Sequence, residues 1–275
     1  MKIIIPGQTI GIIGGGQLGR MLAMSAKEMG YKIAILDPSK DACARHFADT
    51  FIHADFDNRK GLERLCQISD VVTFEFENID SDLLAELEKD YHIVQSASLL
   101  KTAQHRLLEK EFARSLGIET VDYQYVDQDT TGVQVDGTYL MKTVRFGYDG
   151  KGQSRITEAS QVQPYTLLER LVPLDKEISV VAYKDRTGIG IVAVVENEHR
   201  NNILYRSIVP TTASPEQEAQ AIDYTHRILE AADYYGVLTV EFFISQGRVI
   251  FNEILPEDYP YDNGVQTSKH LKKVM

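Results

Sequence analysis

The chain has 275 residues, 43% hydrophobic and 25% charged, which is enough to bury the cores of about two domains. Its 29 basic and 40 acidic residues give a formal charge of −11, which provides no basic surface for nucleic acid or for an anionic membrane. No apolar run approaches the ~20 residues of a membrane span, and the start has no signal-peptide pattern. Cys43 and Cys66 form neither a metal-ligand pair nor a disulfide framework, so we expect a cytoplasmic protein that acts on small molecules.

Strand-like and helix-like segments alternate over the first ninety residues. The β-branched segments predict strands at Thr9–Ile13, Lys32–Leu36, Asp70–Phe74 and His92–Val94, and the intervening apolar spacing predicts helices at Leu18–Met29, Lys60–Ile68 and Ser81–Lys89. This alternation is typical of a parallel sheet with crossover helices. We therefore expect an α/β domain that ends near residue 95.

A glycine-rich turn, GIIGGGQLGR at residues 11–20, follows the first predicted strand. Its Gly14, Gly16 and Gly19 have the G-x-G-x-x-G spacing of a dinucleotide-binding turn, and Asp37 follows at the distance of a ribose-binding acid. These features favour an NAD-dependent dehydrogenase. A tight strand-to-helix turn with no cofactor would have the same pattern, so the turn alone does not decide the function.

The second part of the chain has mostly strands. It begins with a helix predicted at Ser96–Lys110, and a second helix is predicted at Pro215–Tyr235. Predicted strands cover Tyr139–Thr143, Arg155–Thr157, Thr166–Leu171, Glu177–Tyr183, Gly190–Glu196, Leu238–Ile244 and Arg248–Ile254. Many strands with few intervening helices predict an α+β domain.

A second glycine-rich segment, LMKTVRFGYDGKGQ at residues 140–153, places Lys142 at a strand end, before Gly147, Gly150 and Gly152. Glycines leave backbone N–H groups free to surround phosphate oxygens, and a lysine neutralises their charge. A solvated hairpin tip is the alternative. Because a strand-end lysine beside a ligand loop is not a core residue, we expect Lys142 to lie outside the core.

Two acidic residues face each other in a predicted hairpin whose turn is Ser245–Gly247. Glu241 and Glu253 would lie on adjacent strands, where they repel each other unless a cation such as Mg²⁺ lies between them or both point into solvent. A glycine-rich phosphate loop, a strand lysine and a carboxylate pair are together the components of an Mg-ATP site. An NAD-dependent dehydrogenase would leave this loop and this pair unexplained.

The order of GIIGGGQLGRM, TFEFENID, AQHRLLEK, MKTVRFGYDGKGQ, VVENEHRNNIL and FNEI resembles the ATP-grasp family, and within it the N5-carboxyaminoimidazole ribonucleotide synthases of purine biosynthesis. The resemblance covers almost all of residues 9–255. It implies a Rossmann-like pre-ATP-grasp domain with a parallel sheet at 1–95, followed by an ATP-grasp fold at 96–275 with a lid at about 115–170. In that family the first glycine turn helps to seat a phosphoribosyl substrate and does not bind NAD.

The resemblance also implies roles for single residues. The implied ATP site consists of Arg106, Lys142, Gly147, Tyr148, Asp149, Gly150, Lys151, Gly152, Gln153, Glu169, Arg170, Leu171, Val172, Glu177, His199, Asn252 and Glu253. Within it, residues 169–172 would be a strand edge that binds adenine, Glu177 would bind the ribose, and His199 would lie near the nucleotide. Glu241 and Glu253 would hold Mg²⁺. Lys142, Tyr148 and Asp149 would be catalytic, and the aminoimidazole ribonucleotide would contact Gly16, Gln17, Leu18, Glu75 and Tyr148.

The implied reaction is the ATP-dependent carboxylation of 5-aminoimidazole ribonucleotide with bicarbonate. Carboxyphosphate would be the intermediate, and N5-carboxyaminoimidazole ribonucleotide, ADP and phosphate would be the products. The family resemblance also leads us to expect a homodimer.

The sequence departs from the family pattern after NEI. The family continues with alanine-proline-arginine, a His-Asn-Ser-Gly run and about a hundred further residues, whereas this chain has Glu257 in place of the arginine and ends at Met275. An acid near a substrate phosphate reverses the local electrostatics. We therefore expect a chain that lacks the family's carboxy-terminal domain, and we keep as an alternative a shortened homologue that binds ATP but is catalytically impaired.

Overall fold

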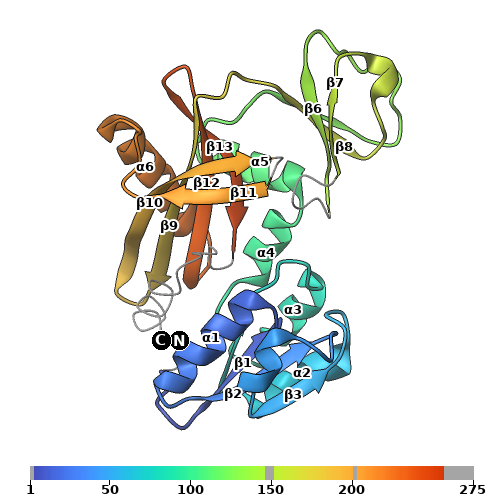
Figure 1. Ribbon diagram of the computed structural model, residues 1–275. Helices are drawn as coiled ribbons and strands as arrows, with labels where there is room; N and C mark the ends of the chain where they lie inside the picture. Colours follow the sequence, from blue (N-terminus) through green and yellow to red (C-terminus); the bar gives the residue numbers. More distant parts are fainter. Residues whose placement is uncertain (1–2, 146–151, 201–202, 257–275) are drawn as a thin grey trace.

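The computed structural model describes residues 3–145, 152–200 and 203–256, which form three β-sheets. Figure 1 shows the amino-terminal sheet, coloured blue, at one end of the molecule and the other two sheets at the opposite end. No helix in the described ranges is both long enough and apolar enough to cross a bilayer.

The amino-terminal sheet is entirely parallel, as predicted, and has the order β3-β2-β1-β4. Its elements are β1 (Thr9–Ile13), α1 (Gln17–Glu28), β2 (Lys32–Asp37), η1 (a 3₁₀ helix, Cys43–Phe47), β3 (Thr50–His53), α2 (Arg59–Ile68), β4 (Val71–Phe74) and α3 (Ser81–Leu87). Separate apolar clusters cover its two faces. Such burial on both faces explains the nearly continuous isoleucine and valine of the strands.

Two local predictions for this sheet were wrong. The edge strand β3 was missed because its half-exposed side chains give it neither an apolar run nor an alternating pattern. Residues His92–Val94 form no full strand, and they contribute only an isolated parallel bridge between Ile93 and Val72.

The helix expected at Ser96–Lys110 is in fact two helices, α4 (Ala97–Ala103) and α5 (Arg106–Ser115). The chain is extended at His105, and the Arg106 N–H bonds to the carbonyl oxygen of Val144 at 3.0 Å. The Gln104 side chain donates to the carbonyl oxygens of Glu77 and Ile79. Tertiary hydrogen bonds therefore break the helix where local propensity does not, and they place Arg106 at the first turn of α5.

The largest sheet is antiparallel, with the order β11-β10-β9-β12-β13. It consists of β9 (Lys176–Asp185), β10 (Gly188–Arg200), β11 (Ile203–Ile208), β12 (Gly236–Ser245) and β13 (Arg248–Leu255), and helix α6 (Pro215–Ala231) packs on one face. Helix α6 begins with a capping box between Ser214 and Gln217. It ends four residues earlier than predicted because the chain turns extended at Ala232 and buries the ring of Tyr234.

The small sheet has the order β5-β8-β6-β7 and completes the predicted α+β part. It consists of β5 (Tyr123–Val126), β6 (Tyr139–Thr143), β7 (Gln153–Ile156) and β8 (Thr166–Arg170), with a short 3₁₀ helix, η2 (Ala159–Gln161), before β8. Strands β5 and β11 were not predicted from the sequence. Strand β8 bonds to β5 on one side and to β6 on the other, so it lies inside the sheet.

The glycine turn after β1 generates a stability prediction. Gly14 has a φ of +105°, and a Cβ at this position would lie 2.6 Å from the Glu75 side chain. Gly132 also has a positive φ, +79°, but open space around it. A positive φ costs a residue with a Cβ about 1–2 kcal/mol, so Gly132→Ala is expected to lose about that amount. Gly14→Ala should lose clearly more in chemical unfolding, whereas equal losses would show that the Glu75 carboxylate moves aside freely.

Candidate functional site

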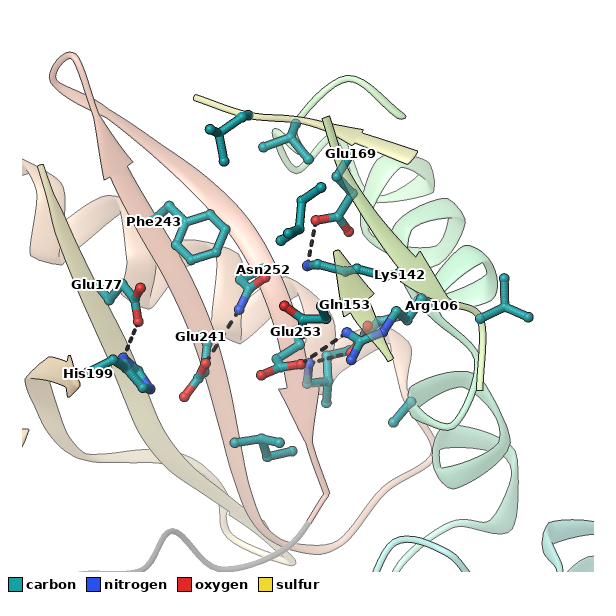
Figure 2. Close-up of a pocket in the computed structure, with 18 of the residues that line it drawn as sticks. Arg106, Lys142, Gln153, Glu169, Glu177, His199, Glu241, Phe243, Asn252 and Glu253 are labelled. Carbon is teal, nitrogen blue, oxygen red and sulfur yellow. Dashed lines mark hydrogen bonds and ion pairs between the residues drawn. The ribbon is translucent and has the colours of Figure 1, made fainter. Parts of the chain in front are cut away.

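A cleft of about 720 Å³ lies between the largest sheet and the small sheet. Figure 2 shows side chains from both sheets and from α5 pointing into it. The predicted ATP-site and metal residues that line it are Arg106, Lys142, Gln153, Glu169, Arg170, Leu171, Val172, Glu177, His199, Glu241, Asn252 and Glu253. Of the predicted loop residues, Gly147, Tyr148, Asp149, Gly150 and Lys151 lie outside the described residues. Gly152 does not line the cleft, and its carbonyl accepts from the N–H of Thr143, next to Lys142.

Lys142 is 5% exposed and forms an ion pair with Glu169, with 2.6 Å between Nζ and Oε2. The expectation that this lysine lies outside the core was therefore wrong, because a carboxylate on β8 compensates its charge. Burial by itself would raise the pKa of Glu169, but the Lys110 and Lys142 ammonium groups outweigh it and hold that pKa at about 2. Glu169 is therefore an ionised carboxylate at the cleft.

Residues 169–172 do not form a strand edge as a whole. Glu169 pairs with β5 on one side and with β6 on the other. Arg170 pairs with β6, its N–H bonds to the Asp122 carbonyl, and the Leu171 N–H bonds to the Thr138 carbonyl. The edge interpretation was therefore wrong for Glu169 and Arg170, since their backbone groups are already bonded within the sheet. Leu171 and Val172 lie beyond the strand end and line the cleft.

Glu241 and Glu253 face each other across the β12-β13 hairpin, in the register that the sequence predicted. Asn252 is the extra residue of a β-bulge between this pair and the next one, and such bulges redirect side chains. Burial, followed by the charge of Glu253, raises the pKa of Glu241 well above its usual range. The pair therefore does not simply point into solvent, which was one of the two alternatives.

The groups around this pair are suited to a hard cation. Arg106 Nη1 lies 3.5 Å from Glu253 Oε2, and the Asn252 amide approaches Glu241 Oε2 at 3.5 Å. Asn252 Oδ1 is buried without a hydrogen-bond donor in the described part of the chain. The two facing carboxylates are oxygen donors of the kind that Mg²⁺ or Ca²⁺ prefers.

Glu177 and His199 come from the adjacent strands β9 and β10 and lie at the other side of the cleft. Glu177 Oε2 lies 2.5 Å from His199 Nδ1, and both side chains are partly exposed. The hydrogen bond that the His199 ring donates to the Glu177 carboxylate raises the pKa of His199. As single residues in the sequence they resemble ordinary surface groups, and only the sheet register makes them a pair.

The amino-terminal glycine turn bonds to the protein's own carboxylates. The Gly16 N–H donates to Glu75 Oε1 at 2.8 Å, and the Gly15 N–H donates to Asp37 Oδ2 at 2.7 Å. A dinucleotide would need these amides for its pyrophosphate and Asp37 for its ribose. This internal bonding argues against the dehydrogenase interpretation.

The predicted substrate residues Gly16, Gln17, Leu18 and Glu75 gather at this turn and at the start of α1, and they do not line the cleft. Glu77, two residues after Glu75, does line it. The sequence analysis assigned no role to Glu77 or to Glu109, another residue that lines the cleft. Both are acids next to apolar residues, and burial raises the pKa of each, to about 8 for Glu109. Their apolar neighbours in the sequence were the signal that could have marked these two acids as buried site residues.

Residues 7–104 match the family model of the ribonucleotide synthetase preATP-grasp domain, and residues 111–272 match that of the ATP-grasp domain. The chain is 38% identical to an N5-carboxyaminoimidazole ribonucleotide synthase of Bacillus subtilis (strain 168), over 97% of this chain and 73% of that protein. It is 39% identical to the protein of the same name from Staphylococcus aureus (strain COL), over 94% and 72%.

Solved structures agree with these matches. The fold is similar to that of N5-carboxyaminoimidazole synthetase from Staphylococcus aureus complexed with ADP, with a TM-score of 0.91 and 35% identity over 100% of this chain and 79% of that chain. The N5-carboxyaminoimidazole ribonucleotide synthetase of Thermotoga maritima gives a TM-score of 0.84 at 28% identity, over 97% and 75%.

The Glu177–His199 pair predicts a pH dependence. The folded protein holds the His199 proton more tightly than the unfolded chain, whose ordinary histidine pKa is 6.5. The stabilisation is therefore fully present below that pH and is lost as the pH rises through the raised pKa of His199. NMR titration should show a lower pKa for His199 in Glu177→Gln than in wild type. Glu198→Gln, which removes a carboxylate paired with Arg200 and Arg206, should change it far less; an equal change would contradict a specific pair.

Proposed function

Because this chain belongs to the N5-carboxyaminoimidazole ribonucleotide synthase family of ATP-grasp ligases, we propose that it carboxylates 5-aminoimidazole ribonucleotide with bicarbonate at the expense of ATP. The products are N5-carboxyaminoimidazole ribonucleotide, ADP and phosphate, and the reaction belongs to purine biosynthesis. The observation that carries this proposal is the meeting of Arg106, Lys142 and the Glu241/Glu253 pair in one cleft. Phosphoryl transfer from ATP needs cations and metal ligands in that combination.

The adenine, ribose and phosphates of ATP are proposed to lie along the cleft beside the side chains that can bind each of them. Leu171 and Val172, beyond the end of β8, contact the adenine, and Glu177 accepts hydrogen bonds from the ribose hydroxyls. Arg106 and Lys142 contact the phosphates. The segment from Gly147 to Gln153 is proposed to cover them, with Tyr148 and Asp149 among the catalytic residues.

Magnesium fits the acidic end of the cleft. Glu241 and Glu253 would hold it, with Asn252 beside them, and the bound ion would neutralise charge on the β- and γ-phosphates. Because Glu241 is hard to ionise in this site, we expect cation binding to release a proton from it.

The proposed reaction needs no nucleophile from the protein. A bicarbonate oxygen attacks the γ-phosphorus of ATP, and the bond to the ADP oxygen breaks, giving carboxyphosphate and ADP. Lys142 and Arg106 stabilise the negative charge that develops on the transferred group. The exocyclic amine of the ribonucleotide then attacks the carboxyl carbon, or the CO₂ released from it, and phosphate leaves.

The amino-terminal turn is proposed as the substrate side of the enzyme. The Glu75 carboxylate accepts a hydrogen bond from the Gly16 N–H, so it fixes the turn at which Gly16, Gln17 and Leu18 would contact the ribonucleotide.

The domain limits at residue 95 and at 115–170, the homodimer and the cytoplasmic location stay predictions.

Phosphate release from ATP and bicarbonate, measured with and without aminoimidazole ribonucleotide, tests the proposed function directly. We expect release that depends on the ribonucleotide, together with a carboxylated product detectable by mass spectrometry. Binding of Mg-ATP without any such release would support the impaired homologue instead. A thermal shift with NADH but none with ATP would revive the dehydrogenase.

Glu253→Gln removes a charged metal ligand while keeping the shape of the side chain. Since a contact to a charged group is worth about 1.5–3 kcal/mol, Mg-ATP affinity should fall about 10- to 100-fold in calorimetry. Glu119→Gln is the control, because the side chain of this partly exposed glutamate pairs with Arg248 and does not line the cleft. Wild-type affinity in Glu253→Gln would rule out the metal assignment.

A further inference from the structure

Lys110 is a buried lysine that contacts the Glu169 carboxylate and is not one of the residues that line the cleft. It belongs to α5 and is only 1% exposed, so its side chain does not reach a ligand in the cleft. A charged group so deeply buried is destabilising unless other groups compensate it. Its contacts therefore indicate what the charge does.

Lys110 joins two parts of the nucleotide site. Its Nζ donates to the Asn252 carbonyl at 2.7 Å and lies 3.3 Å from Glu169 Oε1. Asn252 lies in the bulge of β13, and Glu169 is the partner of Lys142 on β8. One ammonium group thus contacts both the strand of the acidic pair and the carboxylate that holds the phosphate lysine.

The contact to β13 matters because β13 is the last strand of its sheet: β12 pairs along one side, and on the other side Phe251 forms an isolated bridge with Thr120. On its other side, α5 supplies side-chain partners: Lys110 bonds to the Asn252 carbonyl, and Glu109 Oε1 accepts from the Ile254 N–H at 2.5 Å. These two consecutive residues bracket Glu253. They hold the backbone on both sides of the proposed metal ligand.

The contact between Lys110 and Glu169 matters because it compensates the negative charge of the Glu169 carboxylate. Lys142 can contact an ATP phosphate only if its ammonium group shares or gives up its 2.6 Å contact with Glu169. Without another cation, Glu169 would then be a buried and uncompensated carboxylate, which is strongly unfavourable. Lys110, whose Nζ lies 3.3 Å from Glu169 Oε1, is a second cation beside this carboxylate.

We propose that Lys110 is a positioning residue for ATP: it is the permanent counter-ion of Glu169, and it thereby allows Lys142 to engage the phosphates. The inference deepens the proposed function and rests on it in one respect, the contact of Lys142 with phosphate. Lys110 itself touches neither ATP nor the reacting atoms.

The test compares nucleotide binding by Lys110→Met and by the double variant Lys110→Met/Glu169→Gln. Lys110→Met should bind ATP at least about tenfold more weakly in calorimetry, because Glu169 then retains Lys142. The double variant should recover to within about threefold of wild type, since the neutral amide that replaces the Glu169 carboxylate no longer competes for Lys142. Adenosine, which has no phosphate, should bind all these proteins about equally.

Controls separate this role from a structural one. Lys101→Met removes an exposed lysine paired with Asp82 and should leave ATP binding unchanged. If Lys110→Met does not fold, Lys110→Gln keeps an N–H donor for the Asn252 carbonyl and should show the same loss and the same recovery with Glu169→Gln.

Three results would overturn the inference: wild-type ATP affinity in Lys110→Met, no recovery in the double variant, or a parallel loss of adenosine and ATP binding. Each of these would leave the proposed function standing, because the wild-type chain would still bind ATP. Absence of ATP binding by the wild type would instead overturn the proposed function, and this inference with it.

Discussion

The ion pair between Glu169 and Lys142 is the interaction on which the geometry of the cleft depends. It is buried and links two neighbouring strands of the small sheet, and Lys110 extends it to the edge of the largest sheet. Buried charges are stable only when their partners are held in place. The packing of α5 between the two sheets therefore sets both the fold at this point and the position of the cations that face the nucleotide.

At the acidic end of the cleft, two groups that carry the same charge when ionised lie together. Glu241 and Glu253 lie opposite each other with Arg106 near only one of them, and burial leaves Glu241 hard to ionise. Such a pair is unfavourable for the empty protein and favourable once a cation binds. Asn252 belongs to the same arrangement, since it is the bulge residue next to Glu253 and its side-chain amide donates to Glu241.

The glycine turn shows that the same glycine spacing can arise from ligand binding or from packing within the protein. Its spacing fits a dinucleotide site, but Glu75 and Asp37 accept the amide hydrogens that a pyrophosphate would need. Gly19 is required for another reason, because a Cβ there would lie 2.5 Å from the Gly14 carbonyl oxygen. Close packing of α1 on the turn is thus sufficient to explain this glycine.

The sequence by itself determined the parallel amino-terminal sheet, most of the strands and the pairing of Glu241 with Glu253, because hydrophobic periodicity and a tight hairpin are local properties. It also contained the motifs that identify the family. Only the tertiary structure decided that α4 and α5 separate at His105, that β8 is an interior strand, and that Lys142 is buried against Glu169. These features depend on residues far apart in the chain, such as Lys110 and Asn252. Their contact is set by how α5 packs against β13, and it leaves no periodic signal in the sequence.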